Sequence, residues 1–230
     1  VKRILDRTPA GGQRMLFSAT LDNDVKVIVD RYLNQPVTHA LDPVDSPVEE
    51  MTHHLVETSQ TEKLSVVTRR AAGADRSLLF TRTKHGAKKL VQQLGKSGIP
   101  AVELHGNLSQ NARERNLADF ASGEVSVLVA TDIAARGIHV DDVRLVVHVD
   151  PPVEHKAFLH RSGRTARAGA DGVVVTVTTP EQRRDVRSMT RAAGIKPIVT
   201  EAVHAKHPLL DDLAGPAQPP RRIAARPATA

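Results

Sequence analysis

The 230-residue sequence predicts a three-layer α/β fold, in which a doubly wound parallel sheet is covered by helices on both faces. Short apolar runs rich in β-branched residues alternate with segments whose apolar residues recur at helical spacing, a pattern typical of such sheets. Aromatic residues make up only 2% of the chain, so the core has to be built from aliphatic side chains. Valine and isoleucine favour strands, which supports the same fold class.

The individual elements follow from this alternation. Residues 13–17 are expected to form a short strand and residues 25–33 a helix, after which the prolines and acids of residues 42–47 predict a linker. Further strands are expected at 54–58, 77–81, 101–104, 125–130, 143–149 and 173–178. The helices between them include one at residues 61–72 and another that places Ala87, Leu90, Val91 and Leu94 on one face.

The composition narrows the partners and the location. The formal net charge of +6 favours an anionic partner, nucleic acid before a membrane surface. No apolar run approaches the ~18 residues of a membrane-spanning helix, so no membrane partner is predicted. The absence of cysteine fits a reducing compartment, and we predict a cytoplasmic location. The histidines are scattered, and the adjacent His53 and His54 would point to opposite faces of a strand, so no metal site is predicted.

Polar residues follow three of the expected strands at the point where each strand ends. They are Thr81-Arg82-Thr83-Lys84, His105-Gly106-Asn107 and Thr131-Asp132. In a doubly wound sheet, ligands bind at the carboxyl ends of the strands. The sequence therefore predicts a phosphate-handling site at this edge.

An arginine-rich segment, His160 to Gly169, carries the strongest chemical signal. Arg161, Arg164 and Arg167 recur every three residues, and guanidinium groups offer paired donors that suit phosphate oxygens. An arginine brought to a γ-phosphate stabilises the charge of the transition state. The alternative is a solvated basic helix end, which the fixed spacing of the three arginines between His160 and Gly169 disfavours.

Several segments together resemble the motifs of DEAD-box RNA helicases of superfamily 2, in family order and at family spacing. Ser18-Ala19-Thr20 resembles motif III, and residues 79–83 resemble motif IV. Residues 130–137 resemble motif V, and residues 160–167 resemble motif VI. Gln110-x-x-Arg113 and residues 147–152 resemble two further family elements. The resemblance covers residues 18–169 and extends to about 203.

The resemblance implies a RecA-like fold and a role for each matching residue. Arg164 and Arg167 would reach the γ-phosphate of ATP, with Arg167 as the arginine finger, and His160 would link this catalytic site to the first domain. Other nucleotide contacts are expected from Arg136, Gly137 and His139. The RNA backbone track is expected to include Thr81, Arg82, Gly106, Gln110, Arg113, Thr131 and Asp132. Ser18 and Thr20 would couple hydrolysis to duplex opening.

Two positions depart from the family pattern. His139 stands where the family usually has an aspartate that contacts the ATP ribose. Ala166 stands where the family usually has glycine, and we expect this alanine to cost little.

The resemblance also implies partners outside this chain. The sequence has no G-x-x-x-x-G-K-[ST] phosphate loop and no Asp-Glu-Ala-Asp box. We therefore expect ATP and Mg²⁺ as cofactors, with Mg²⁺ held mainly by the first RecA-like domain, and no hydrolysis by this chain alone. The expected RNA is single-stranded or a short duplex, bound with little sequence preference.

The implied domain organisation has four segments. Residues 1–40 are expected to be a remnant of the first RecA-like domain, 41–50 a linker, 51–203 the second RecA-like domain, and 204–230 a disordered basic tail rich in proline and arginine. An exposed apolar helix face in residues 1–40 is expected to allow self-association. Two other functions stay open at this point: a superfamily 2 DNA helicase or translocase, and a non-catalytic module that binds ribonucleoprotein.

Overall fold

A computed structural model describes residues 1–9, 11–18, 23–39, 51–72, 76–135, 138, 140, 143–166 and 171–213. The chain divides into two compact units, Val1–Ser46 and Pro47–Ala230. The boundary falls within residues 41–50, the predicted linker, which lie outside the described residues.

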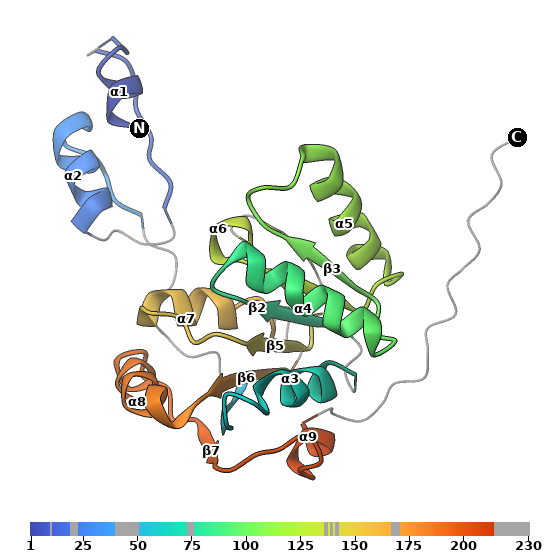
Figure 1. The fold of residues 1–230 in the computed structure, drawn as a ribbon. Coiled ribbons are helices and arrows are strands. Elements are labelled where there is room, and N and C mark those ends of the chain that lie inside the picture. The colour runs from blue at the N-terminus through green and yellow to red at the C-terminus, as the bar shows by residue number, and fades with distance from the viewer. Residues whose placement is uncertain are drawn as a thin grey trace, which may run out of the picture. The chain divides into compact units, whose positions relative to one another are not determined.

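The second unit is built on a seven-stranded sheet in the order β3-β4-β2-β5-β6-β1-β7, in which every described pair of strands is parallel (Figure 1). This confirms the predicted RecA-like, doubly wound fold class. The strands are β1 (Met51–Glu57), β2 (Ser77–Phe80), β3 (Ala101–Leu104), β4 (Val127–Ala130), β5 (Leu145–His148), β6 (Gly172–Thr178) and β7 (Ile198–Thr200). Every residue of β2, β4 and β5 is buried, as expected for strands covered on both faces.

Helices cover both faces of this sheet. They are α3 (Lys63–Ala72), α4 (Lys84–Lys96), α5 (Gln110–Ser122), α6 (Asp132–Ala135), α7 (His155–Ser162), α8 (Arg183–Ala192) and α9 (Leu209–Asp212), with a 3₁₀ turn at Pro180–Gln182. One core cluster joins α3, α4 and α9 to the sheet, and two others join α5 and α6, and α7 and α8. Alternate residues of the central strands enter opposite clusters, as Leu78 and Leu79 do in β2.

Helices α4 and α5 are the two longest helices that the structure describes in the sheet domain. Each begins after a residue whose side chain caps the helix. Thr83 accepts a hydrogen bond from the backbone amide of Gly86 at 3.0 Å, and Ser109 accepts one from Ala112 at 3.3 Å. Helix α5 is followed by its C-cap residue Gly123, whose φ of 83° lies in the left-handed region that glycine adopts readily. These caps fix α4 and α5 directly after the ends of β2 and β3.

The first unit contains α1 (Lys2–Leu5) and α2 (Asn23–Tyr32). Helix α2 confirms the helix predicted at residues 25–33. The strand predicted at residues 13–17 is wrong, because these residues have no regular structure and both Met15 and Phe17 are exposed. An apolar run forms a strand only beside a hydrogen-bonding partner, and no described residue of this unit provides one.

The predicted disordered tail begins too early. Residues 204–213 are ordered against the second unit: Leu210 and Leu213 are buried, and the Val203 amide donates to the Glu57 carbonyl at 2.9 Å. The Arg70 guanidinium also donates to the Leu213 carbonyl. The proline and arginine composition that indicates disorder starts only after Leu213, outside the described residues.

Among the helices that the structure describes, none is long and apolar enough to cross a membrane. The described residues also contain no group of three or more His, Cys, Asp or Glu side chains arranged to hold a metal ion.

Candidate ATP and RNA site

The carboxyl ends of the central strands lie level with one another. Phe80 of β2 is in register with Ala130 of β4 and with His148 of β5, and Ala130 is in register with Leu104 of β3. The residues that follow continue the hydrogen bonding, because the Thr81 amide donates to Ala130 and the Thr131 amide donates to Leu104, at 3.0 and 3.1 Å. The three polar segments predicted to form one site are therefore brought to one edge.

Arg161 is the centre of this edge. Its side chain is only 4% exposed, its Nε lies 2.5 Å from Asp132 Oδ1, and its Nη2 lies 2.7 Å from Asp132 Oδ2. Its Nη1 donates to the Asp150 carbonyl at 2.7 Å, and its guanidinium lies over the Phe80 ring at 5.2 Å. A single buried arginine thus ties α7 to α6, β2 and the end of β5.

Asp150 extends this network to α3. Its Oδ1 accepts from Lys63 Nζ at 2.8 Å, and its Oδ2 accepts from the Arg82 amide at 3.0 Å. Burial alone would raise the pKa of Asp150, but the Lys63 ammonium and the Arg82 amide outweigh it and hold the pKa below the usual value. The carboxylate therefore stays ionised and fixes the loop after β2.

His160 and Arg164 face a small cavity of about 70 Å³, which Asp132 and Arg161 also line. Arg164 Nη1 donates to the Ile138 carbonyl at 3.0 Å, which holds the guanidinium near the segment after α6. Guanidinium donors suit phosphate oxygens. A cavity of this size is far smaller than the ~300 Å³ or more of a small-molecule pocket, so the described residues fit only part of a nucleotide.

Several predicted RNA-contacting side chains already have partners within the chain. Thr81 is buried and its hydroxyl donates to the Thr83 carbonyl at 3.2 Å. Gln110 donates to Glu114 at 2.6 Å, and Arg113 Nη2 donates to the Ala134 carbonyl at 2.8 Å. Both carboxylate oxygens of Asp132 are likewise bound to Arg161. These contacts within the chain show that Thr81, Gln110, Arg113 and Asp132 shape the edge, and the RNA contacts of the four residues stay predictions.

Arg82 and Gly106 are exposed at the edge, and Thr131 is half-buried at the start of α6. Ser18 is exposed in the first unit. The other predicted site residues lie outside the described residues: Thr20, Arg136, Gly137, His139 and Arg167.

Sequence reasoning missed three members of the network. Arg161 was visible in the arginine triplet but received no role of its own, and Asp150 lies in the segment that resembles the family element at residues 147–152. No local pattern marks Lys63, which is 87 residues from its partner Asp150.

Comparisons with known proteins agree with this geometry. The family model described as "Helicase conserved C-terminal domain" matches residues 58–169. A DEAD-box ATP-dependent RNA helicase 3B, chloroplastic, of Zea mays is 41% identical over 201 residues, covering 84% of this chain and 27% of that protein. A DEAD-box ATP-dependent RNA helicase 9, mitochondrial, of Arabidopsis thaliana is 36% identical over 199 residues, covering 84% of this chain and 32% of that protein.

A solved structure gives the same result. S. cerevisiae Dbp5 bound to RNA and ADP BeF3 superposes with a TM-score of 0.78 at 25% identity, covering 92% of this chain and 57% of that one. The fold and the arginine-bearing edge therefore define a helicase C-terminal domain. The chain corresponds to the C-terminal domain of DEAD-box helicases, and it spans about a third or less of the two relatives above.

The comparisons bear on the alternatives left open by the sequence. The two relatives above are named as ATP-dependent RNA helicases, and neither is named as a DNA translocase or a binding module. The predicted cytoplasmic location is wrong by the same comparison, because these relatives are chloroplastic and mitochondrial. The absence of cysteine does not distinguish the cytosol from these organelles, so the amino-acid composition was not a sound basis for predicting a cytoplasmic location.

Proposed function

We propose that this chain forms the C-terminal half of an enzyme that uses ATP to separate RNA strands or remodel ribonucleoprotein. It would work with a first RecA-like domain in the same polypeptide, to which residues 1–40 would belong. Ile4, Met15, Phe17 and Val37 are strongly exposed, which supports the proposal that more of that domain covers them. Left uncovered, the same side chains would promote self-association.

The observation that carries the proposal is the bidentate pair between Arg161 and Asp132. This pair anchors α7 at the strand edge, and α7 leads directly into Arg164 and Arg167. A rigid base is needed because an arginine stabilises a transition state only when its position is set in advance. Arg164 and Arg167 would bind the γ-phosphate of ATP, with His160 beside them.

ATP would supply the phosphoryl group, and its Mg²⁺ would be held mainly by the first domain. The described residues that line the small cavity include the cationic side chains of Arg161 and Arg164, which would suit the phosphates of a shared site. This chain alone would therefore bind ATP weakly and hydrolyse none.

RNA would run along the exposed part of the strand edge, past Arg82, Gly106 and Thr131. Thr81, Gln110, Arg113 and Asp132 would act mainly by fixing the backbone of this track. Contacts to the phosphates and sugars would dominate, so sequence preference would be low. The similar Dbp5 structure is described as bound to RNA and ADP BeF3, which supports RNA and a nucleotide as ligands of this kind of domain.

The test is ATP hydrolysis by the full-length protein, with and without single-stranded RNA. Arg167→Ala and Arg164→Ala should each lower RNA-stimulated turnover, Arg167→Ala by on the order of 10³-fold, while RNA binding persists. Arg184→Ala, an exposed arginine of α8, is the control and should leave turnover unchanged. Turnover that ignores RNA, or an unaffected Arg167→Ala enzyme, would contradict the proposal.

A further inference from the structure

Helix α4 has an unusually one-sided charge. Its 13 residues, KHGAKKLVQQLGK, contain four lysines and a histidine and no acidic residue. Helix α5 mixes both signs, and the arginines of α8 are accompanied by Asp185. Helix α3 also lacks acidic residues, but its Lys63 and Arg69 pair with Asp150 and Asp211, so its charges are already partnered within the chain.

The charges of α4 lie on its solvent face. Ala87, Leu90 and Leu94 are buried in the core cluster beneath the helix. The exposed residues form what we call the α4 basic face: Lys84, His85, Lys88, Lys89 and Lys96. Spacings of three, four and seven residues keep these side chains on one side of a helix.

The lysines of the α4 basic face have no ion pair with any residue that the structure describes. On α8, by contrast, Arg183 pairs with Glu57 and Arg187 pairs with Glu201. The acid on the neighbouring strand β3, Glu103, lies 3.5 Å from His105 and is only 23% exposed. Like charges four residues apart repel, so an external anion would stabilise this face.

The position of α4 connects this face to the candidate site. The helix starts at Lys84, immediately after the edge segment Thr81–Thr83, and runs away from the edge over the face that α3 also covers (Figure 1). At 1.5 Å per residue, Lys88 lies about 6 Å and Lys96 about 18 Å along the axis from Lys84. A nucleic-acid strand leaving the edge would meet a row of ammonium groups.

The chemistry of the face selects among anionic partners. Protein interfaces are depleted in lysine and enriched in aromatic residues, methionine and arginine, none of which the α4 basic face contains. Membrane-surface helices need an exposed apolar stripe, whereas Ala87, Leu90 and Leu94 of α4 are buried and Val91 is half-buried against the core. Lysine ammonium groups without aromatic partners suit phosphates of a nucleic-acid backbone.

We propose that the α4 basic face is a second RNA-binding surface, which holds the phosphates of a strand after it leaves the strand-edge site. The inference rests on the proposed RNA helicase function and extends its binding surface beyond the family motifs. With no aromatic side chain to stack on bases, the face adds affinity and salt dependence but no sequence preference. Long RNA strands gain from it and short ones do not.

The experiment uses this 230-residue chain and labelled single-stranded oligouridines. Fluorescence anisotropy gives Kd over a series of salt concentrations, for a short oligomer that fills only the edge and for a long one. The variant is Lys88→Gln/Lys89→Gln/Lys96→Gln, which spares Lys84 because it adjoins the edge. For the long oligomer, the slope of log Kd against log salt should fall by about 2, since each lost single-strand phosphate contact removes about 0.7.

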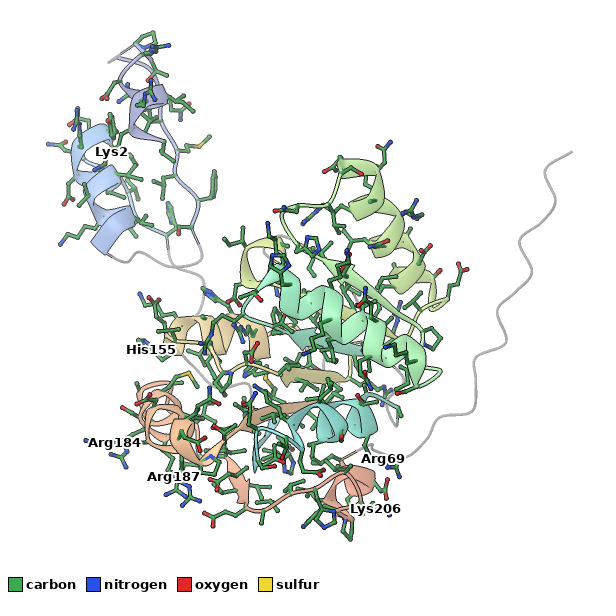
Figure 2. All side chains as sticks on the ribbon, viewed as in Figure 1. Lys2, Arg69, His155, Arg184, Arg187 and Lys206 are labelled. Carbon is green, nitrogen blue, oxygen red and sulfur yellow. The ribbon has the colours of Figure 1, made fainter. Side chains whose placement is uncertain are left out.

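The control removes the same charge elsewhere, as Arg184→Gln/Lys196→Gln/Lys206→Gln. Arg184 and Lys206 lie on α8 and before α9, well separated from α4 (Figure 2). These residues are exposed, so both triple variants should keep the wild-type melting temperature. The control should keep the wild-type salt slope, and the short oligomer should bind both variants alike.

The outcomes separate the inference from the proposed function. If the α4 variant keeps the wild-type slope with the long oligomer, or loses no more than the control, the second surface is wrong while RNA binding at the edge stands. If the unaltered chain binds neither oligomer, the inference and the proposed RNA track are both overturned. A slope lowered only in the α4 variant and only for the long oligomer supports the inference.

Discussion

Both carboxylate oxygens of Asp132 accept hydrogen bonds from the Arg161 guanidinium, at 2.5 and 2.7 Å. Asp132 opens the short helix after β4, and Arg161 lies in the last turn of α7. The two side chains thus join the segments that resemble motifs V and VI of the family. Because Arg161 also donates to the Asp150 carbonyl, the pair fixes two loops at once.

The first prediction concerns this pair. Arg161→Ala should lower the free energy of unfolding by about 1–3 kcal/mol, because Asp132 and the Asp150 carbonyl lose charged donors near the protein interior. Asp132 is 40% exposed, so water compensates part of the loss and the upper values for fully buried pairs do not apply. Urea denaturation followed by circular dichroism measures the change.

Arg187→Ala is the matched control, since Arg187 pairs with Glu201 at the surface and both side chains are about half exposed. An exposed pair of this kind contributes at most about 1 kcal/mol. Equal losses in the two variants would show that the Arg161 pair is no stronger than a surface contact.

The second prediction concerns Ala166, which has φ of 52°. A side chain in this left-handed region costs about 1–2 kcal/mol, which argues against the expectation that alanine costs little here. Ala166→Gly should therefore stabilise the chain by about 0.5–1 kcal/mol, after the greater freedom of glycine in the unfolded state is subtracted. The melting temperature measures the gain.

Ala193→Gly is a suitable control for the second prediction, because Ala193 has φ of −81° and gains no relief of strain. It should destabilise the chain. If Ala166→Gly also destabilises, the left-handed conformation at Ala166 is not a source of strain.

The sheet and its ligand-binding edge were predictable because they depend on local patterns. A strand such as β4 is buried on both faces and therefore appears in the sequence as an unbroken apolar run. Polar residues directly after such runs indicate the ligand-binding edge of the sheet. The family resemblance implies an RNA contact for Asp132, because the motif that carries it is a local segment of the sequence. Its pairing with Arg161, 29 residues away, depends on how α7 packs, which no local pattern contains.

The two wrong predictions, the strand at residues 13–17 and the disordered tail from residue 204, also arise because the structure there depends on contacts that the local sequence does not contain. Residues 13–17 are apolar enough for a strand, but a strand also needs a partner, and sequence alternation says nothing about one. Leu209–Asp212 forms a single helical turn, which is too short to show a helical period in the sequence. Its burial depends on contacts with α3, more than a hundred residues earlier, as the Arg69–Asp211 ion pair illustrates.

The third prediction concerns pH. Burial, with a smaller effect of His54, lowers the pKa of His53 to about 4, and His53 stacks on Phe158 at 5.6 Å. An unfolded histidine binds its proton near pH 6.5, so between about pH 6.5 and 4 the unfolded chain holds the extra proton. The free energy of unfolding should therefore fall as pH drops through this window, by up to about 1.4 kcal/mol per pH unit for each such histidine.

His148 contributes to the same window, because complete burial, with smaller effects of Arg161 and His53, holds its pKa well below the usual value. His53→Phe keeps a ring against Phe158 but removes one titrating group, so it should flatten the slope without abolishing it. Denaturation midpoints at several pH values measure this. A slope identical to wild type would mean that His53 is protonated equally in both states.

The last prediction concerns the C-terminal segment after β7. Leu210 is 2% exposed and belongs to the core cluster that α3 and α4 also form, so the residues after His204 are part of the folded domain. Leu210→Ala should lower the free energy of unfolding by about 2–4 kcal/mol, through lost burial and the cavity left behind. Ile198→Ala, which removes a side chain that is 55% exposed, is the control and should cost well under half as much. Chemical denaturation measures both variants. If Leu210→Ala is no worse than Ile198→Ala, the segment is a detachable tail, as its composition alone suggests, and Leu210 contributes nothing to the core.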